Sequence, residues 1–178
     1  MDLNVINKIY FTGIGGIGVS ALARYFHALK KKVSGSDLQH SFITDALENE
    51  GITVFLSQKK KTITTDIDIH IYSPAVPADD KERVQAIELG IPSYSYPEFL
   101  GVLSKLYKTI AVSGTNGKTT TTAMTGDILR GTDYDPHVIV GSLVSAWNSN
   151  MRIGSSEYFV MEACEHRAHM LKLDAFGA

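Results

Sequence analysis

Short apolar segments alternate with longer amphipathic segments along most of the chain. The short segments are rich in β-branched and aromatic residues, which favour strands, whereas the longer ones repeat apolar residues three and four positions apart, as helices do. Strands that alternate with helices predict an α/β fold with a mostly parallel sheet. The first such unit is a strand over residues 8–12 and a helix whose buried stripe is Val19, Leu22, Ala23, Phe26 and Leu29.

The same alternation continues to about residue 107. The pattern predicts further strands at 33–35, 52–56, 66–72 and 91–94. It predicts helices at 42–50, from about Asp80 to Leu89, and from Pro97 onward. Asp79 or Asp80 is suited to cap the second of these helices, and Gly51 and Gly90 are suited to end two of them. We therefore expect residues 1–107 to form a Rossmann-like parallel-sheet domain.

The pattern starts again at Lys108. It predicts a strand at 109–113, a helix to about Arg130, a strand at 137–141 and a strand at 158–161 that ends in Glu162. Residues 147–156 are rich in Asn, Gly and Ser, which predicts a loop. Only 178 − 107 = 71 residues follow the first domain, about half of a typical domain. We therefore expect residues 108–178 to be an incomplete second domain.

Composition narrows the class of protein. The formal net charge is −2, which argues against a polycationic nucleic-acid-binding surface. One cysteine, Cys164, cannot form an intramolecular disulfide and fits a reducing compartment. The chain has neither a signal-peptide pattern nor an apolar run long enough to cross a membrane. We expect a cytoplasmic protein with no nucleic-acid or membrane partner.

A first glycine-rich turn lies between the first strand and the first helix and fits G-x-G-x-x-G. Glycines let the backbone N–H groups approach an anion, and the start of the helix adds a favourable dipole. Asp37 lies 19 residues after Gly18, close to the spacing of an acid that binds a ribose hydroxyl. The turn predicts a nucleotide diphosphate site, and taken alone it suggests NAD as the ligand. The alternative is a turn that only packs the helix against the strand. Its residues are Gly13, Ile14, Gly15, Gly16, Ile17 and Gly18.

A second glycine-containing turn follows the strand at 109–113 and ends in G-K-T, as a Walker A loop does. It is a shorter relative of that loop, because the first glycine of the standard spacing would fall at Val112. Its lysine can reach the β- and γ-phosphates of a nucleotide, and its first threonine can bind Mg²⁺. Glu162 can add a carboxylate to this magnesium site. The alternative for the turn is a chance G-K-T in a polar loop, and the alternative for Glu162 is a structural helix cap. The turn consists of Gly114, Thr115, Asn116, Gly117, Lys118, Thr119 and Thr120.

With these motifs the sequence resembles the Mur ligases of peptidoglycan synthesis, most closely those that join L-alanine to UDP-N-acetylmuramate. The matching segments are IYFTGIGGIGVSALARYFH, KVSGSD, YSPAVP, ELGIP, IAVSGTNGKTTTTAM and FVMEACEHR. The resemblance implies that 13–18 face the UDP pyrophosphate and that Ser36, Asp37 and Ser73 lie near uridine. It implies that 114–120 hold ATP in the first part of a P-loop-type α/β ATPase domain. Lys118 and Glu162 would be catalytic, and Thr119 and Glu162 would bind Mg²⁺.

The reaction that the resemblance implies is an ATP-dependent amide synthesis. ATP would phosphorylate the lactyl carboxylate of UDP-N-acetylmuramate, and the amine of L-alanine would attack the acyl phosphate. Because the family's C-terminal domain has no counterpart in these residues, we expect the chain alone not to be fully active. Three alternatives remain: a ligase that adds a tripeptide to the same sugar, an NAD-dependent oxidoreductase, and a non-catalytic binding module. Self-association through the incomplete second domain is a further expectation.

The segment after Glu162 departs from the family pattern. Cys164 stands where many relatives have aspartate, and Glu165, His166, Arg167 and His169 follow. A zinc site is one interpretation, although no second ligand cluster supports it. Contact of His166 or Arg167 with the anionic substrate and a plain surface helix are the others. Residues 141–154 match the family poorly and receive no role.

Overall fold

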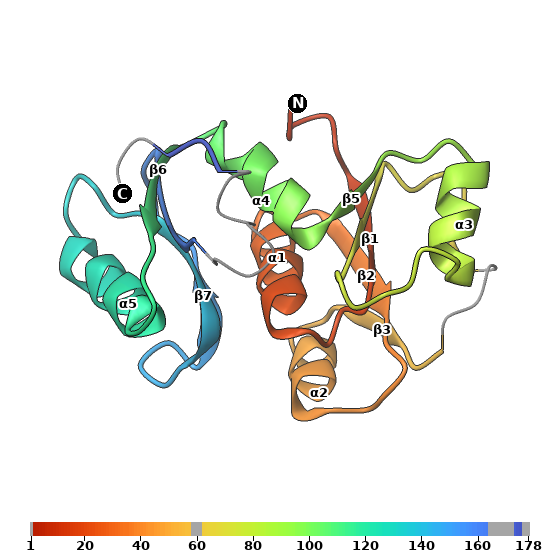
Figure 1. Ribbon diagram of the computed structural model, residues 1–178, viewed down its shortest axis with the longest axis horizontal. Helices are drawn as coiled ribbons and strands as arrows, with labels where there is room; N and C mark the ends of the chain where they lie inside the picture. The colour runs from red at the N-terminus through yellow and green to blue at the C-terminus, as the bar shows by residue number, and fades with distance from the viewer. Residues whose placement is uncertain (1, 58–61, 164–172, 176–178) are drawn as a thin grey trace. The chain divides into compact units, whose positions relative to one another are not determined.

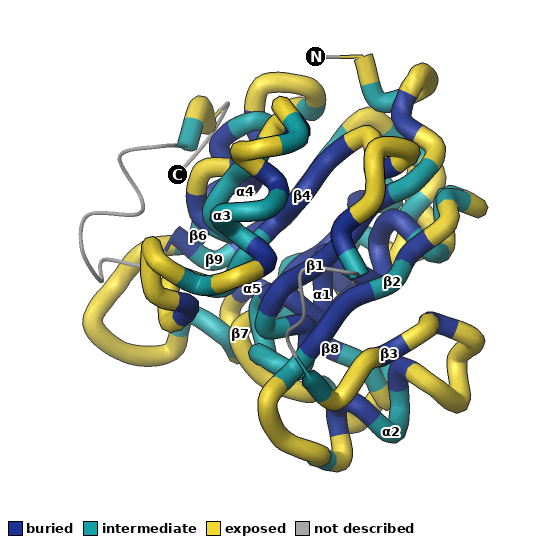
Figure 2. Tube along the Cα trace, turned by 90° about the vertical axis from the view of Figure 1, so that its right-hand side faces the viewer, coloured by how far each residue is buried: buried dark blue, intermediate teal, exposed yellow. Residues whose placement is uncertain are grey.

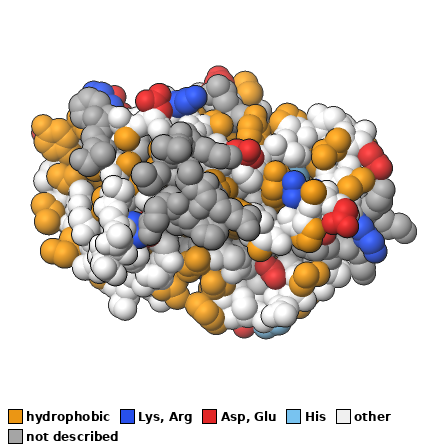
Figure 3. Space-filling view, in the orientation of Figure 1, with side chains coloured by type: hydrophobic (Ala, Val, Ile, Leu, Met, Phe, Trp, Pro, Cys, Tyr) orange, Lys and Arg blue, Asp and Glu red, His pale blue; other side chains and the backbone are white. Residues whose placement is uncertain are grey.

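The computed structural model describes residues 2–57, 62–163 and 173–175. The chain divides into two compact units, Met1–Tyr96 and Pro97–Ala178. The division after residue 107 that the sequence suggests stays a prediction. Within the described residues no helix is both long enough and apolar enough to cross a bilayer. On the face shown in Figure 3, the described acidic and basic side chains are scattered among hydrophobic and other residues.

The first unit is built on a parallel sheet with the strand order β3-β2-β1-β4-β5. Figure 1 labels β3, β2, β1 and β5 of this sheet. Every neighbouring pair of strands is parallel. This confirms the predicted α/β class with a Rossmann-like parallel sheet. Because the second and third strands lie on one side of β1 and the fourth and fifth on the other, the order reverses between β1 and β4. The strands are β1 (Lys8–Thr12), β2 (Lys32–Ser36), β3 (Thr53–Phe55), β4 (Ile69–Tyr72) and β5 (Ser93–Ser95).

Helices cover both faces of this sheet because neighbouring residues of a strand point to opposite sides. On one face, Phe11 of β1 packs against Phe26, with ring centroids 6.4 Å apart. On the other face, Tyr10 joins a buried cluster with Ile67 and Ala86. Figure 2 shows β1 and β2 buried along most of their length. The helices that begin in this unit are α1 (Ile17–Ala28), α2 (Phe42–Asn49), α3 (Lys81–Glu88) and α4 (Tyr96–Ser104).

Side-chain caps fix where two of these helices begin. Ser41 and Thr44 form a reciprocal capping box at the start of α2. The carboxylate of Asp80 accepts hydrogen bonds from the N–H groups of Glu82 and Arg83, so Asp80, rather than Asp79, caps α3. This cap places Glu82 in the first turn of α3, and it therefore also fixes the position of the buried Glu82 side chain.

The strand predicted over 66–72 is wrong in its first half, since β4 begins only at Ile69. Asp68 instead accepts hydrogen bonds from the N–H groups of Asn7 and Lys8, at 2.7 and 2.8 Å. Asp66 pairs with the ammonium of Lys8 at 2.6 Å. These carboxylates hold the start of β1, so the alternating pattern is partly a turn. The strands predicted at 52–56 and 91–94 are shortened and shifted to Thr53–Phe55 and Ser93–Ser95.

Among its described residues, the second unit contains a sheet with the order β6-β9-β7-β8 and the helix α5. β6, β9 and β7 are parallel, whereas β8 runs antiparallel to β7. α5 packs closely on β7, because a Cβ at Gly126 would lie 2.7 Å from Val138. The elements are β6 (Lys108–Val112), α5 (Lys118–Leu129), β7 (His137–Val144), β8 (Ser149–Arg152) and β9 (Tyr158–Glu162).

The loop predicted over 147–156 is wrong in its middle part, because residues Ser149–Arg152 form β8, whereas the residues on either side are irregular or turn. A tight turn joins β7 to β8, and Asn148 adopts the left-handed conformation that asparagine tolerates, with φ of 49°. The Trp147 indole N–H donates to Asp127 of α5 at 2.7 Å. Asn150 and Met151 are buried. Pairing with β7 and burial therefore outweigh the weak strand propensity of these polar residues.

Candidate functional site

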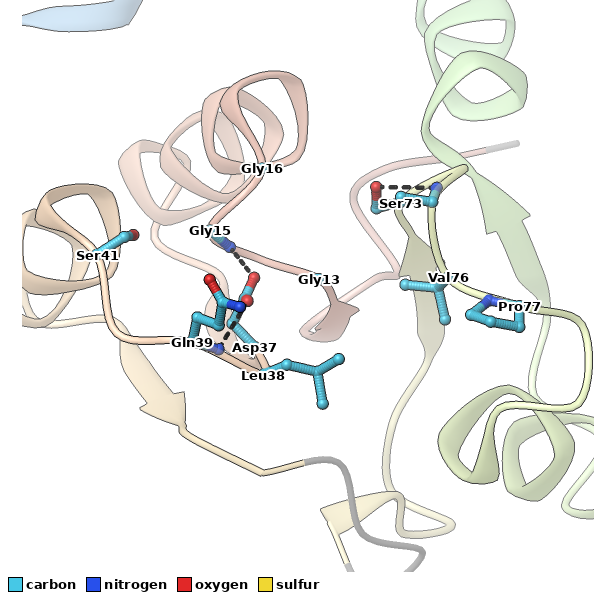
Figure 4. Close-up of a pocket in the computed structure, with 11 residues that line it drawn as sticks. Gly13, Gly15, Gly16, Asp37, Leu38, Gln39, Ser41, Ser73, Val76 and Pro77 are labelled. Atoms are coloured by element: carbon cyan, nitrogen blue, oxygen red, sulfur yellow. Dashed lines mark hydrogen bonds between the residues drawn. The ribbon is translucent and has the colours of Figure 1, made fainter.

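A pocket of about 370 Å³ opens at the carboxyl ends of β1, β2 and β4. It lies where the strand order reverses, the place at which open α/β sheets bind their ligands. Its volume lies in the range of small-molecule sites. In Figure 4, Asp37 and Leu38 lie on one side of it and Ser73, Val76 and Pro77 on the other. The pocket is lined by Gly13, Gly15, Gly16, Asp37, Leu38, Gln39, Ser41, Ser73, Ala75, Val76 and Pro77.

Gly13 shapes the floor of the pocket. Its φ of +77° is a conformation that favours glycine, and a Cβ on it would lie 2.9 Å from the Cβ of Ser73. The N–H groups of Gly13 and Ile14 both donate to the carbonyl of Ser36, at 2.8 and 2.9 Å. The start of the glycine turn is therefore tied to the end of β2, and these two donors are already used within the protein.

Asp37 lies half-buried beside the turn. Its Oδ2 accepts a hydrogen bond from the N–H of Gly15 at 2.9 Å, and its Oδ1 accepts one from Gln39 at 3.3 Å (Figure 4). The N–H of Gly16 donates to the carbonyl of Gly13 at 3.2 Å. Because the first N–H groups of a helix have no partner within that helix, an anion in the pocket would meet the start of α1.

The structure separates the residues predicted for this site. Gly13, Gly15, Gly16, Asp37 and Ser73 line the pocket, whereas Ile14, Ile17, Gly18 and Ser36 do not. Ile14 is buried, and a Cβ on Gly18 would lie 2.6 Å from the Tyr96 ring, which is a packing constraint. Ser36 directs its hydroxyl to Glu82.

Sequence reasoning missed the other lining residues, which follow Asp37 and Ser73 directly along the chain. Their signal was this position after strand ends that meet at one edge of the sheet. The missed residues are Leu38, Gln39, Ser41, Ala75, Val76 and Pro77.

The second glycine turn is an exposed loop between β6 and α5. Gly114 and Gly117 have φ of +146° and +77°, a region that favours glycine. α5 begins at Lys118, and its N-cap, Gly117, provides no side-chain cap. The ammonium of Lys118 donates to the carbonyl of Gly114 at 2.6 Å. The loop thus presents the start of a helix and a lysine, which together suit a phosphate group.

Glu162 lies at the same edge of the second sheet as this loop. It is paired in register with Val112, the last residue of β6, and the N–H of Ala163 donates to the carbonyl of Val112 at 2.9 Å. Oε1 of Glu162 accepts a hydrogen bond from the N–H of Gly141 at 2.8 Å. The carboxylate of Glu162 and the hydroxyl of Thr119 are hard oxygen ligands, the kind that Mg²⁺ prefers. The donor set therefore fits the predicted ion.

The predictions for Cys164, Glu165, His166, Arg167 and His169 concern positions outside the described residues.

Comparison with known proteins gives two family matches in chain order. Residues 8–108 match the profile of the Mur ligase family, catalytic domain, and residues 112–176 match the Mur ligase middle domain. The chain is 43% identical over 170 residues to a UDP-N-acetylmuramate--L-alanine ligase of Clostridium kluyveri, covering 95% of this chain and 37% of that protein. It is 46% identical over 162 residues to the ligase of the same name in Caldicellulosiruptor saccharolyticus, covering 90% of this chain and 35% of that protein.

A solved structure agrees with the sequence matches. The UDP-N-acetylmuramate-alanine ligase of Thermotoga maritima superposes with a TM-score of 0.78 at 31% identity, covering 88% of this chain and 37% of that one. The chain spans little more than a third of the length of the curated relatives described above. The first family profile alone matches more than half of the chain. The chain therefore belongs to the Mur ligase family.

Proposed function

We propose that the chain supplies the UDP-sugar-binding and ATP-binding parts of a cytoplasmic ligase that joins L-alanine to UDP-N-acetylmuramate. The observation that carries this proposal is that the two glycine turns each lie at the carboxyl edge of their own sheet and each within its own family match. The names of the relatives in Clostridium kluyveri and Caldicellulosiruptor saccharolyticus favour L-alanine over a tripeptide as the second substrate.

The first pocket would bind the UDP part of the sugar nucleotide. The pyrophosphate would lie at the start of α1, next to Gly15 and Gly16, where the helix dipole favours negative charge. Asp37 would accept hydrogen bonds from the uridine ribose. Since its carboxylate holds the N–H of Gly15 at 2.9 Å without a ligand, it would also keep the glycine turn in place for the phosphate.

The loop at 114–120 would bind ATP. Lys118 would leave the carbonyl of Gly114 and place its charge at the β- and γ-phosphates, while N–H groups at the start of α5 face phosphate oxygens. Thr119 and Glu162 would hold Mg²⁺, which when bound neutralises charge on the phosphates. Gly141 would support this site by fixing the carboxylate of Glu162.

In the reaction, the γ-phosphoryl group of ATP moves to the lactyl carboxylate of the sugar. The amine of L-alanine then attacks the acyl phosphate, forms the amide bond, loses a proton and releases phosphate. The first step brings two anions together, so most of the catalysis comes from positioning and from neutralising their repulsion. Lys118 would contribute to both.

Titration calorimetry tests the proposal on the purified chain. UDP-N-acetylmuramate should bind to it, NADH should not, and Mg²⁺-ATP should bind independently of the sugar nucleotide. Asp37→Asn should weaken binding of the sugar nucleotide, whereas Asp45→Asn, at a half-buried acid on α2 that pairs with His40, should leave it unchanged. Binding of NADH without binding of UDP-N-acetylmuramate would reject the proposal in favour of an oxidoreductase.

A further inference from the structure

A fully buried carboxylate, that of Glu82 in α3, joins several elements of the first unit. Two hydroxyls donate to its Oε1, those of Tyr10 at 2.8 Å and Thr62 at 2.7 Å. Two more donate to its Oε2, those of Thr12 at 2.7 Å and Ser36 at 2.5 Å. An ionised carboxylate has about four sites that accept hydrogen bonds. These hydroxyls donate to both oxygens of the carboxylate, and the start of α3 favours a negative charge at this position.

His70 extends this network. Its Nε2 lies 2.9 Å from the hydroxyl oxygen of Thr12. Burial lowers the pKa of His70 to about 4, with a smaller contribution from Arg83, so the ring is neutral at pH 7. Because Thr12 gives its only proton to Glu82, its oxygen must accept the proton on Nε2 of His70. The hydrogen bonds are therefore donated in one direction, from His70 to Thr12 and from Thr12 to Glu82.

Two of the four hydroxyl residues directly precede, along the chain, residues that line the pocket. Thr12 precedes Gly13, and Ser36 precedes Asp37. The carbonyl of Ser36 accepts the N–H of Gly13 at 2.8 Å, and the carbonyl of Thr12 accepts the N–H of Ser73 at 3.0 Å. Each residue therefore binds Glu82 with its side chain and a pocket loop with its backbone. Neither Tyr10 nor Thr62 directly precedes a residue that lines the pocket.

We propose that Glu82 is a positioning residue for the nucleotide-sugar pocket, acting through Thr12 and Ser36 to fix the ends of β1 and β2. The inference rests on the proposed function of the pocket. Glu82 does not line the pocket. It would act by fixing the positions, relative to one another, of the glycine turn, Asp37 and Ser73, which follow three different strands. Ordered support of this kind governs how precisely a site is held.

Thr12→Val and Thr62→Val form a matched pair that tests this role. Each variant replaces one hydroxyl by a methyl of similar size and leaves Glu82 with one donor fewer, so both should unfold at lower urea concentration. Thr12→Val should raise the dissociation constant of UDP-N-acetylmuramate about tenfold, since it loosens a residue joined to the pocket. Thr62→Val should leave that constant unchanged. Thr12→Ser, which keeps the hydroxyl, should restore binding, and Mg²⁺-ATP should bind all variants equally.

Amide chemical shifts give a second readout that needs no ligand. Thr12→Val and the size-conserving Glu82→Gln should both shift the amides of Gly15 and Asp37, whereas Thr62→Val should not. Equal effects of the two valine variants on sugar-nucleotide binding and on these amides would show that the network serves stability alone and overturn the inference. Failure of the wild-type chain to bind the sugar nucleotide would instead reject the proposed function. Binding by the wild type with unchanged affinity in Thr12→Val would reject only the role of Glu82.

Discussion

The N–H of Gly141 donates to Oε1 of Glu162 at 2.8 Å, and a Cβ built on Gly141 would lie 2.8 Å from Oε2 of the same carboxylate. The glycine therefore both binds the carboxylate and leaves the space that it occupies. The two residues come from the neighbouring strands β7 and β9. A residue in a segment without an assigned role thus controls the direction of the acid predicted to bind Mg²⁺.

Gly141→Ala should displace the Glu162 carboxylate and weaken Mg²⁺-ATP binding. A loss of about tenfold in affinity is expected, the usual effect of disturbing a group that orients a metal ligand. Calorimetric titration with Mg²⁺-ATP measures it, and Ser142→Ala at the next, exposed position is the control. Equal affinity of Gly141→Ala and the wild type would show that Gly141 does not orient Glu162 for the nucleotide.

Lys118→Met should remove most of the affinity for ATP while leaving the pocket beside Gly13 and Asp37 intact. The methionine keeps the apolar length of the side chain but loses the ammonium that donates to Gly114 and that would reach the phosphates. We expect at least about a tenfold rise in the dissociation constant of Mg²⁺-ATP, because hydrogen bonds to charged groups contribute about 1.5–3 kcal/mol. Lys105→Met, at an exposed lysine, serves as the matched control. Similar losses in both variants would point to a general effect of charge.

Gly18→Ala should destabilise the first unit through a clash with Tyr96. The added Cβ would lie 2.6 Å from the ring, and overpacking of this kind costs about 1–3 kcal/mol. Tyr96→Ala removes the obstacle. In urea unfolding, the double variant should therefore be less destabilised than the sum of the two single variants. Additive losses would mean that the last glycine of the turn is needed for another reason.

The buried imidazole of His70 should make the first unit less stable as the pH falls. Its pKa is about 4 in the folded protein and 6.5 as the ordinary value. Below pH 6.5 the unfolded chain binds a proton that the folded protein refuses until about pH 4. The stabilisation is thus complete above pH 6.5 and is lost between these values.

Between about pH 7.5 and about pH 4.5 the loss should amount to about 2–3 kcal/mol. His70→Gln can keep a donor near Thr12 but does not titrate, so its unfolding free energy should fall by that much less over the same range. Parallel pH dependence of the wild type and His70→Gln in urea unfolding would contradict the neutral buried state of His70.

The local sequence pattern was sufficient to predict much of the secondary structure. It was insufficient where pairing between distant segments determines whether a segment forms a strand. The strand at Lys8–Thr12 was predicted with its observed bounds, because its residues favour a strand and are mostly buried. β8 was missed because Asn150 carries a loop signal, and only its partner strand β7 gives it a reason to be extended. Asp66 and Asp68 fitted an alternating strand, yet their carboxylates bind groups at Asn7 and Lys8.

The site shows the same division. Motif spacing placed Gly13, Gly15 and Asp37 together, and they line one pocket. Ser36 was expected beside uridine as well, but neighbouring residues of an extended chain point to opposite sides, so Ser36 turns to Glu82 while Asp37 turns to the pocket. Glu82 carries no motif; only the tertiary fold shows that a glutamate in the first turn of a helix is buried among four hydroxyls.

The most direct test of the nucleotide-sugar site is a titration of the ¹⁵N-labelled chain with UDP-N-acetylmuramate, followed by amide chemical shifts. Saturable shifts should concentrate at Gly13–Gly18, at Asp37–Ser41 and at Ser73–Pro77, with the loop at 114–120 responding only to Mg²⁺-ATP. Absence of saturable shifts in the first three segments, or shifts confined to the opposite edge of the sheet around Lys8 and Lys32, would contradict the assignment of this pocket.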